Sequence, residues 1–166
     1  MRMVVVKMKV KISALYEDSQ LPKKMHKGDV GMDCHIHNFK NINIDRETIN
    51  DLDDEEILIF PGQRVLCGLG FAIDIPSGYY AQIVPRSGMT LWNGFSILNT
   101  PGTIESRDRA EDGAIVVLNG VKPHKLKKGM RICQLIIRKE VEFELEAHKT
   151  LSKSERGEDG FGSTGD

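Results

Sequence analysis

Cysteine is scarce in this sequence, and its spacing argues against a zinc site. The 166-residue chain has three cysteines, Cys34, Cys67 and Cys133, and none of them belongs to a Cys-x-x-Cys pair. Cysteine-rich zinc sites usually bring such pairs together. Each cysteine is flanked by apolar or strand-forming residues. We therefore expect buried free thiols in a reducing compartment.

The chain also lacks a long apolar run and an excess of one charge. Its apolar start, Met1–Val6, is interrupted at Lys7, which is too early for a signal peptide or a membrane span, so we expect a cytoplasmic protein that does not bind membranes. With 23 basic and 24 acidic side chains, the net charge of -1 gives no electrostatic footprint for nucleic acid. Aromatic residues make up only 6%, which argues against a platform for stacking single strands.

Short apolar or alternating segments separated by glycine and proline turns dominate what is present. Alternation with a period of two is typical of half-buried strands, and many short strands with such turns indicate an all-β sandwich or barrel with little helix. The expected strand segments are Val6–Ile12, Asp33–His37, Arg64–Ile75 with breaks at Gly68 and Gly70, Tyr79–Val84, Ala114–Leu118, Ile132–Ile137 and Val141–Glu146.

The length fits one domain followed by a tail. We expect a β domain over residues 1–148 and a flexible C-terminal arm over residues 149–166, where the composition shifts to lysine, serine, glutamate and glycine. Residues 41–56 are acidic and polar, and we expect a surface insertion in which Asp45 caps a short helical stretch through Leu52. One helical turn is expected at Met89–Trp92.

The end of the chain, Arg156–Asp166, has glycines around a single large apolar residue, Phe161. Glycines let backbone N–H groups converge on an anion, Ser163 and Thr164 add hydroxyl donors, and the Phe161 ring offers a face for a flat partner. This composition predicts a lid that closes over a nucleotide. The alternative is a glycine-rich terminus without a function.

A second candidate phosphate site follows the apolar strand that ends at Val84. The run Pro85-Arg86-Ser87-Gly88 offers a guanidinium, a hydroxyl and an unobstructed backbone N–H, which are the donors that phosphate needs. Taken alone, such a triplet is more often an ordinary turn.

Three further polar residues could complete a phosphate-transfer site. Glu105 follows a Pro-Gly turn and could deprotonate a water, although it could equally face solvent. Asp33 could hold Mg²⁺ through water or cap a turn. Gln134 is the one polar residue in an apolar strand and could donate to phosphate or to a water on the metal, or be a satisfied strand amide.

Taken together and in order, these segments resemble the trimeric dUTP pyrophosphatases, the dUTPase family. The resemblance is carried by Pro85–Gly88, Asn99–Ile104, Arg131–Leu135 and Gly160–Gly165. It implies a β jelly roll, or β-clip, assembled as a homotrimer with active sites shared between subunits. It also implies hydrolysis of dUTP to dUMP and pyrophosphate with Mg²⁺ as cofactor.

The resemblance implies a role for each candidate residue. Glu105 stands at the position of the catalytic base, and Asp33 is expected near the metal waters. The substrate contacts that it implies are Arg86, Ser87, Gly88 and Gln134 at the phosphates, Asn99, Gly102, Thr103 and Ile104 at the uracil pocket, and Arg156, Phe161, Gly162, Ser163 and Thr164 in the closing arm.

The segment after Ile104 departs from the family pattern. Glu105 replaces an aspartate, Arg107 replaces a second aspartate, and Asp108 replaces the tyrosine that packs under the deoxyribose. Two alternatives to dUTP hydrolysis therefore stay open. One is a related pyrimidine nucleotide enzyme of the same fold, such as a dCTP deaminase or a pyrophosphatase for a modified dUTP. The other is a non-catalytic regulator that binds nucleotides.

Overall fold

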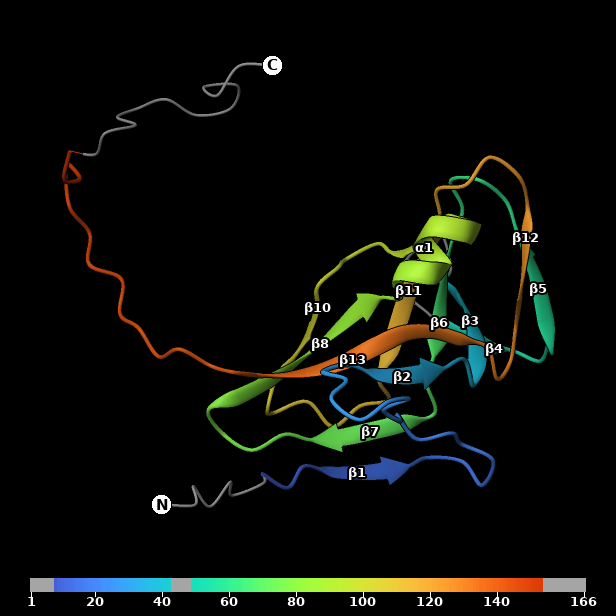
Figure 1. Cartoon of the computed structure of the whole chain (residues 1–166), viewed down its shortest axis with the longest axis horizontal. Coiled ribbons are helices and arrows are strands. Elements are labelled where there is room, and N and C mark those ends of the chain that lie inside the picture. The colour runs from blue at the N-terminus through green and yellow to red at the C-terminus, as the bar shows by residue number, and fades with distance from the viewer. Residues whose placement is uncertain (1–7, 43–48, 154–166) are drawn as a thin grey trace.

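The structure is a computed structural model of the chain, and it describes residues 8–42 and 49–153. Within those ranges α1 (Ser87–Asn93) is the one helix, and all other regular structure is strand, as the sequence predicts (Figure 1). The strands in chain order are β1 (Lys11–Ala14), β2 (Met32–His35), β3 (Asn38–Ile42), β4 (Ile49–Leu52), β5 (Glu56–Ile59), β6 (Arg64–Gly68), β7 (Phe71–Asp74), β8 (Tyr79–Pro85), β9 (Phe95–Ile97), β10 (Gly102–Ile104), β11 (Gly113–Leu118), β12 (His124–Lys127) and β13 (Arg131–Lys139).

Two antiparallel sheets form the body of the fold. One has the strand order β10-β8-β13-β2, and the other has the order β4-β3-β6-β11-β9. Two ribbons of two strands each, β1-β7 and β12-β5, complete the described structure. Every strand pair is antiparallel, as expected for strands that are joined by short turns rather than by crossover helices.

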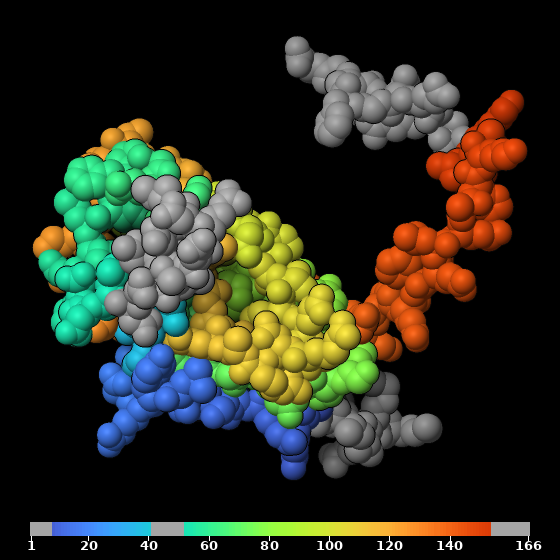
Figure 2. Space-filling view, turned by 180° about the vertical axis from the view of Figure 1, so that it is seen from behind, coloured from blue at the N-terminus to red at the C-terminus, as the bar shows by residue number. Residues whose placement is uncertain are grey.

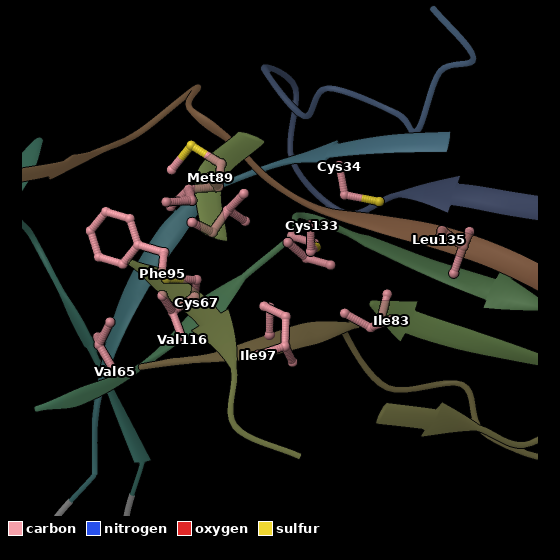
Figure 3. Close-up of a cluster of buried hydrophobic side chains, with 14 of the residues drawn as sticks. Cys34, Val65, Cys67, Ile83, Met89, Phe95, Ile97, Val116, Cys133 and Leu135 are labelled. Atoms are coloured by element: carbon pink, nitrogen blue, oxygen red, sulfur yellow. The ribbon is translucent and has the colours of Figure 1, made fainter. Parts of the chain in front are cut away.

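The hydrophobic core lies between the two sheets (Figure 3). Cys34, Ile83 and Leu135 come from the four-stranded sheet, and Cys67 and Val116 come from the five-stranded one. In β6, β8 and β13 from Cys133 onward, core residues alternate with less buried ones, which is the pattern that a half-buried strand requires. β7 and the end of β11 bury successive residues instead. All three cysteines are buried and free, as the sequence predicts.

Helix α1 confirms the helical turn expected around Met89, which is its buried residue. It ends at Gly94, whose φ of 75° is the left-handed conformation that glycine adopts most easily. A Cβ at Gly94 would also lie 2.6 Å from the Gly120 Cα, so the close approach of these two segments needs glycine at position 94. Among the described residues no helix has the length and apolar character needed to cross a membrane.

Three local expectations are wrong. Residues 8–10 of the expected strand Val6–Ile12 are not in a strand, because β1 begins at Lys11. The expected helical stretch from Asp45 to Leu52 ends in a strand, β4, whose residues pair with β3 from Ile42↔Ile49 to Phe39↔Leu52. Pairing with a neighbouring strand therefore overrides the local capping signal. The expected strand Val141–Glu146 is extended but pairs with no strand among the described residues.

The segment after β13 leaves the body of the molecule (Figures 1 and 2). The Glu140 N–H donates to the Gly78 carbonyl at 2.8 Å, and beyond this contact the chain extends away from both sheets. Val141, Phe143 and Leu145 are 77%, 75% and 88% exposed. Their alternation with glutamates is that of a strand with one apolar face, and nothing in the described chain covers that face.

Asp112 is a buried acid directly before β11. Its N–H donates to the Phe71 carbonyl and its carbonyl accepts from the Leu69 N–H, both at 2.9 Å, which fixes the residue inside the fold. Its Oδ2 is buried and has no hydrogen-bond partner among the described residues. Burial, with the nearby charges of Asp108 and Glu111, raises the pKa of Asp112 to about 7.

We expect the Asp112→Asn variant to be more stable than the wild type above pH 7. The folded state holds the Asp112 proton up to about pH 7, whereas the unfolded chain releases it near pH 4, so this carboxyl costs stability as the pH rises. The full cost is roughly 4 kcal/mol above pH 7 and vanishes below pH 4. Thermal unfolding at pH 4, 6 and 8 measures it, with the exposed Asp54→Asn as control. A gain that does not change with pH would contradict the prediction.

Candidate active site

Asp33 is the centre of a cluster of charged side chains on the outer face of the four-stranded sheet. Its side chain is only 3% exposed. Gln134 Nε2 donates to Oδ1 at 2.8 Å, while Arg131 Nη1 and Arg86 Nη2 contact Oδ2 at 3.1 and 3.2 Å. Arg86 Nη1 also donates to the Arg131 carbonyl at 3.1 Å. The structure thus brings together three of the predicted residues, Asp33, Arg86 and Gln134.

The register of three strands explains this convergence. Asp33 on β2 lies opposite Gln134 on β13, and Gln134 lies opposite Val84 on β8. Because residues directly opposite one another share a face, all three lie on the outer face, while their neighbours point into the core. Arg86 follows Val84 by two residues, at the end of the same strand.

The cluster carries a net positive charge. Burial tends to raise the pKa of Asp33, but the hydrogen bond from Gln134 and the charges of Arg86 and Arg131 outweigh it and hold the pKa below its usual value. His35, on the same strand, has its pKa lowered by burial and by the Arg131 charge, so it is uncharged at neutral pH. Two guanidinium groups therefore face one carboxylate, and the excess charge suits an anion.

The first turn of α1 adds backbone donors next to this cluster. Ser87 and Gly88 are exposed, and the first helical hydrogen bond runs from the Thr90 N–H to the Arg86 carbonyl. The N–H groups before Thr90 therefore precede the helical ladder and are open to other acceptors. No atom lies within 4 Å of the place where a Cβ on Gly88 would stand, so an anion can approach the backbone closely.

The predicted base-binding hairpin lies at the other edge of this sheet. Ile104 is buried and pairs with Ala81, whereas Thr103 is exposed. A Cβ on Gly102 would lie 3.1 Å from the Asn99 amide nitrogen, so glycine lets this side chain pack against the strand. The Glu105 carboxylate is 71% exposed and lies 3.8 Å from the Arg107 guanidinium.

Glu105 opens onto a groove of about 680 Å³. Tyr79 and Tyr80 from β8 and Phe143 from the departing arm line this groove together with Thr103. The lining of the groove therefore combines aromatic rings with a carboxylate. Aromatic walls with a few polar groups are typical of pockets that bind small organic molecules.

One chain does not bring Glu105 to the Asp33 cluster. β2 and β10 are opposite edges of the sheet, separated by β8 and β13, which is three inter-strand spacings or about 14 Å. Along the strands, Asp33 is level with Val84, whereas Ile104 is level with Ala81, and Glu105 lies one residue farther. Combining both offsets puts the two groups roughly 20 Å apart.

The structure also adds residues that the sequence analysis did not select. Arg131 shares the Asp33 carboxylate with Arg86. It was not selected from the sequence, although the segment Arg131–Leu135 was. Its position inside that segment was the available signal. Of the predicted site, five arm residues lie outside the described residues, namely Arg156, Phe161, Gly162, Ser163 and Thr164.

Gly31 is a further addition, because its backbone lies against the Gln134 side chain. A Cβ at Gly31 would stand 2.9 Å from the Gln134 Oε1 and 3.2 Å from its Cβ. Any larger residue would therefore displace the amide that donates to Asp33. Glycine is needed here because of the limited space beside Gln134, and not because of the backbone conformation of Gly31.

We expect Gly31→Ala to weaken the binding of a nucleoside triphosphate about tenfold. The displaced Gln134 amide would lose its hydrogen bond to the charged Asp33 carboxylate, which also holds Arg86. In a Gln134→Ala background the same change should have no further effect, because the displaced amide is already absent. Isothermal titration calorimetry on the wild type, the two single variants and the double variant measures the coupling between residues 31 and 134. Equal losses in both backgrounds would show that Gly31 acts by another route.

Comparison with known proteins supports the resemblance. The sequence model of the dUTPase family matches residues 51–165. A deoxyuridine 5'-triphosphate nucleotidohydrolase of Clostridium tetani is 40% identical over 156 residues, which cover 94% of this chain and 96% of that protein. A protein of the same name from Beijerinckia indica is 48% identical over 109 residues, covering 66% of this chain and 68% of the relative.

Solved structures show the same fold. A mutant dUTPase of Staphylococcus bacteriophage 80alpha, solved with dUpNHpp, has a TM-score of 0.76 at 22% identity and covers 96% of this chain and 99% of its own. The dUTPase of phage phi11 of S. aureus has a TM-score of 0.69 at 16% identity, covering 89% of this chain and all of its own. With the family match and the C. tetani relative, it follows that the chain belongs to the dUTPase family.

Proposed function

We propose that this protein hydrolyses dUTP to dUMP and pyrophosphate, with water attacking the α-phosphate. The observation that carries the proposal is the buried Asp33 carboxylate with Arg86 and Arg131 on it, beside the open first turn of α1. This arrangement offers fixed positive charge and free N–H donors, as the phosphates of a nucleotide require. The relatives named deoxyuridine 5'-triphosphate nucleotidohydrolase give the substrate class.

In this proposal the phosphates bind where Arg86, Ser87 and Gly88 meet. Arg86 stays anchored to Asp33 through Nη2 and to the Arg131 carbonyl through Nη1, so its position is fixed before the substrate arrives. Such preorganised donors stabilise the charge that develops on the phosphate oxygens without having to reorganise. The Gln134 amide, already held by Asp33, lies beside them.

Glu105 acts as the general base. Its carboxylate is exposed and opens onto the aromatic groove, where a bound nucleotide would bring the α-phosphate and a water near it. A carboxylate that accepts a proton from the attacking water gives a typical gain of about 10²–10⁴ in rate. We assign uracil to the hairpin formed by Asn99, Gly102, Thr103 and Ile104.

Mg²⁺ is expected to arrive with the triphosphate. The described residues provide no group of three or more His, Cys, Asp or Glu side chains that could hold a metal by themselves. Asp33 is the carboxylate nearest the phosphate donors, but both its oxygens already accept hydrogen bonds, which suits contact through water better than direct ligation. When bound, Mg²⁺ neutralises phosphate charge and orients the chain of phosphates.

We infer that each active site is shared between copies in a homotrimer. The estimated separation of roughly 20 Å between Glu105 and the Asp33 cluster of one chain supports this, because one triphosphate cannot contact both. A head-to-tail ring of identical chains would bring the hairpin of one copy to the phosphate cluster of the next. The C-terminal arm, with Phe161 on the base and Arg156 on the phosphates, would close the site.

The segment Val141–Glu146 also supports assembly. Its apolar residues are exposed and alternate with Glu142 and Glu144. The chain around the start of β1 has the opposite charge, since Lys9, just before the strand, and Lys11, its first residue, alternate with apolar residues. β1 pairs with β7 alone among the described strands. Opposite charges facing one another favour pairing between strands, so an acidic arm strand of one copy matches the basic edge strand of another.

Pyrophosphate release from dUTP with Mg²⁺ tests the proposed function. We expect turnover by the wild type and a loss of about a hundredfold or more in kcat for Glu105→Gln, with KM little changed, because the base acts only in the chemical step. Glu17→Gln, an exposed glutamate outside the proposed site and the proposed interface, is the matched control. Binding without turnover by the wild type would favour the non-catalytic regulator, and ammonia release from dCTP would favour the deaminase.

Mixing two inactive variants tests whether the site is shared. We expect Glu105→Gln and Arg86→Ala each to be inactive as pure proteins. If Glu105 and Arg86 in one site come from different chains, unfolding and refolding an equal mixture should restore about a quarter of the sites, because some interfaces then join two intact halves. No recovery above the pure variants would place both groups of a site in the same chain.

A further inference from the structure

Arg109 ties the turn that carries Glu105 to a strand outside the turn. Its Nη1 donates to the Ser106 carbonyl at 2.7 Å and to the Asp108 carbonyl at 2.6 Å. Its Nη2 forms an ion pair with the Asp74 carboxylate at the end of β7. One guanidinium therefore joins two carbonyls of the turn to a strand outside it, which a planar group with five N–H donors can do.

Hydrogen bonds inside the turn connect this clamp to Glu105. The Asp108 N–H donates to the Glu105 carbonyl at 3.1 Å, and the Ala110 N–H donates to the Asp108 Oδ1 at 3.0 Å. Asp108 is thus committed to the turn through both its backbone and its side chain. Any movement of the Asp108 carbonyl, which Arg109 holds, is passed to the Glu105 backbone through one hydrogen bond.

The other side of Glu105 is fixed by the sheet. Ile104 is buried, and β10 pairs with β8 up to the Ile104↔Ala81 position. The Glu105 backbone therefore lies between a buried strand on its N-terminal side and the clamped turn on its C-terminal side. The first anchor is tertiary packing, while the second depends on Arg109.

Asp74 is a firm anchor for the clamp. It is the last residue of β7, in which Phe71, Ala72 and Ile73 are buried, and it also pairs with Lys11 of β1 at 3.5 Å. The Arg109 side chain is 53% exposed, so its ion pair contributes about 0–1 kcal/mol to stability. Removing it should leave the fold intact, whereas a displacement of about 1 Å at a catalytic group can cost about a hundredfold in rate.

From this geometry we propose that Arg109, anchored on Asp74, is a positioning residue that sets the place of the Glu105 carboxylate. The inference rests on the proposed function, in which Glu105 is the base. In this proposal Arg109 acts through the backbone of Glu105 and not by contact with the substrate. Lysine cannot replace it, because one ammonium group cannot contact both carbonyls and Asp74 in the same planar arrangement.

Arg107 provides a comparison within the same turn. Its side chain is 91% exposed, and its ion pair with Glu105 spans 3.8 Å. Substituting Arg107 removes the same charge two residues away without removing a hydrogen bond to the Ser106 or Asp108 carbonyl. The two arginines therefore separate an effect of charge from an effect of the clamp.

The test combines kinetics with hydrogen exchange on the full-length protein. We expect Arg109→Ala to lower kcat for dUTP about tenfold to a hundredfold while the Kd for a non-hydrolysable dUTP analogue and the Tm change little. Arg109→Lys should recover only part of kcat, and Asp74→Asn should lower it in the same direction. The exposed Arg64→Ala is the control for activity.

Hydrogen exchange separates failure of this inference from failure of the proposed function. Exchange in the peptide that spans residues 105–110 should accelerate in Arg109→Ala and stay unchanged in Arg107→Ala. If the wild type does not turn over dUTP, the proposed function is wrong, and unchanged exchange in Arg109→Ala would overturn the clamp independently. Wild-type kcat in Arg109→Ala would also overturn the positioning role. A parallel fall in Tm and analogue affinity would assign Arg109 to the fold instead.

Discussion

The pairing of β13 with β8 on one side and β2 on the other is the interaction on which the rest of this structure depends. β13 is the longest strand, with nine residues, and seven of them have partners on β8. Because the register is set by which residues face the core, a shift of one position would turn Cys133 and Leu135 outward and bury Gln134. The hydrophobic core therefore fixes the polar cluster on the opposite face.

That polar cluster explains how one carboxylate can be buried outside the core. Asp33 loses its hydration, which costs free energy, but Gln134 and two guanidinium groups replace the water. Both Asp33 oxygens have partners, and the two arginines carry one positive charge more than Asp33 neutralises, which suits an anion. The same contacts thus hold Arg86 in place and leave its charge available.

The sequence predicts this fold well where a strand has a clear local pattern. It predicts the fold less well where pairing with a distant segment determines the structure. Tyr79–Val84 and Ile132–Ile137 are found within two residues of their expected ends, because both are short, largely apolar runs that follow turn residues. Ile49–Leu52 was misjudged because only pairing with β3 makes it a strand. Arg131 was missed because its role depends on lying next to Asp33, a contact across 98 residues of sequence. The distance between Glu105 and Arg86 depends on strand order, which local patterns do not contain.

The division of the site between two sheet edges has a consequence for the hairpin. If the phosphate cluster that Glu105 serves belongs to another chain, the hairpin cannot rely on that cluster to hold its shape before the chains assemble. Its geometry must come from within its own chain, and the contacts of Arg109 with Ser106, Asp108 and Asp74 are all of that kind. A turn whose residues 105 and 107–110 are exposed has little packing to define it, so directional hydrogen bonds from one planar group are the available means of fixing a carboxylate at its end.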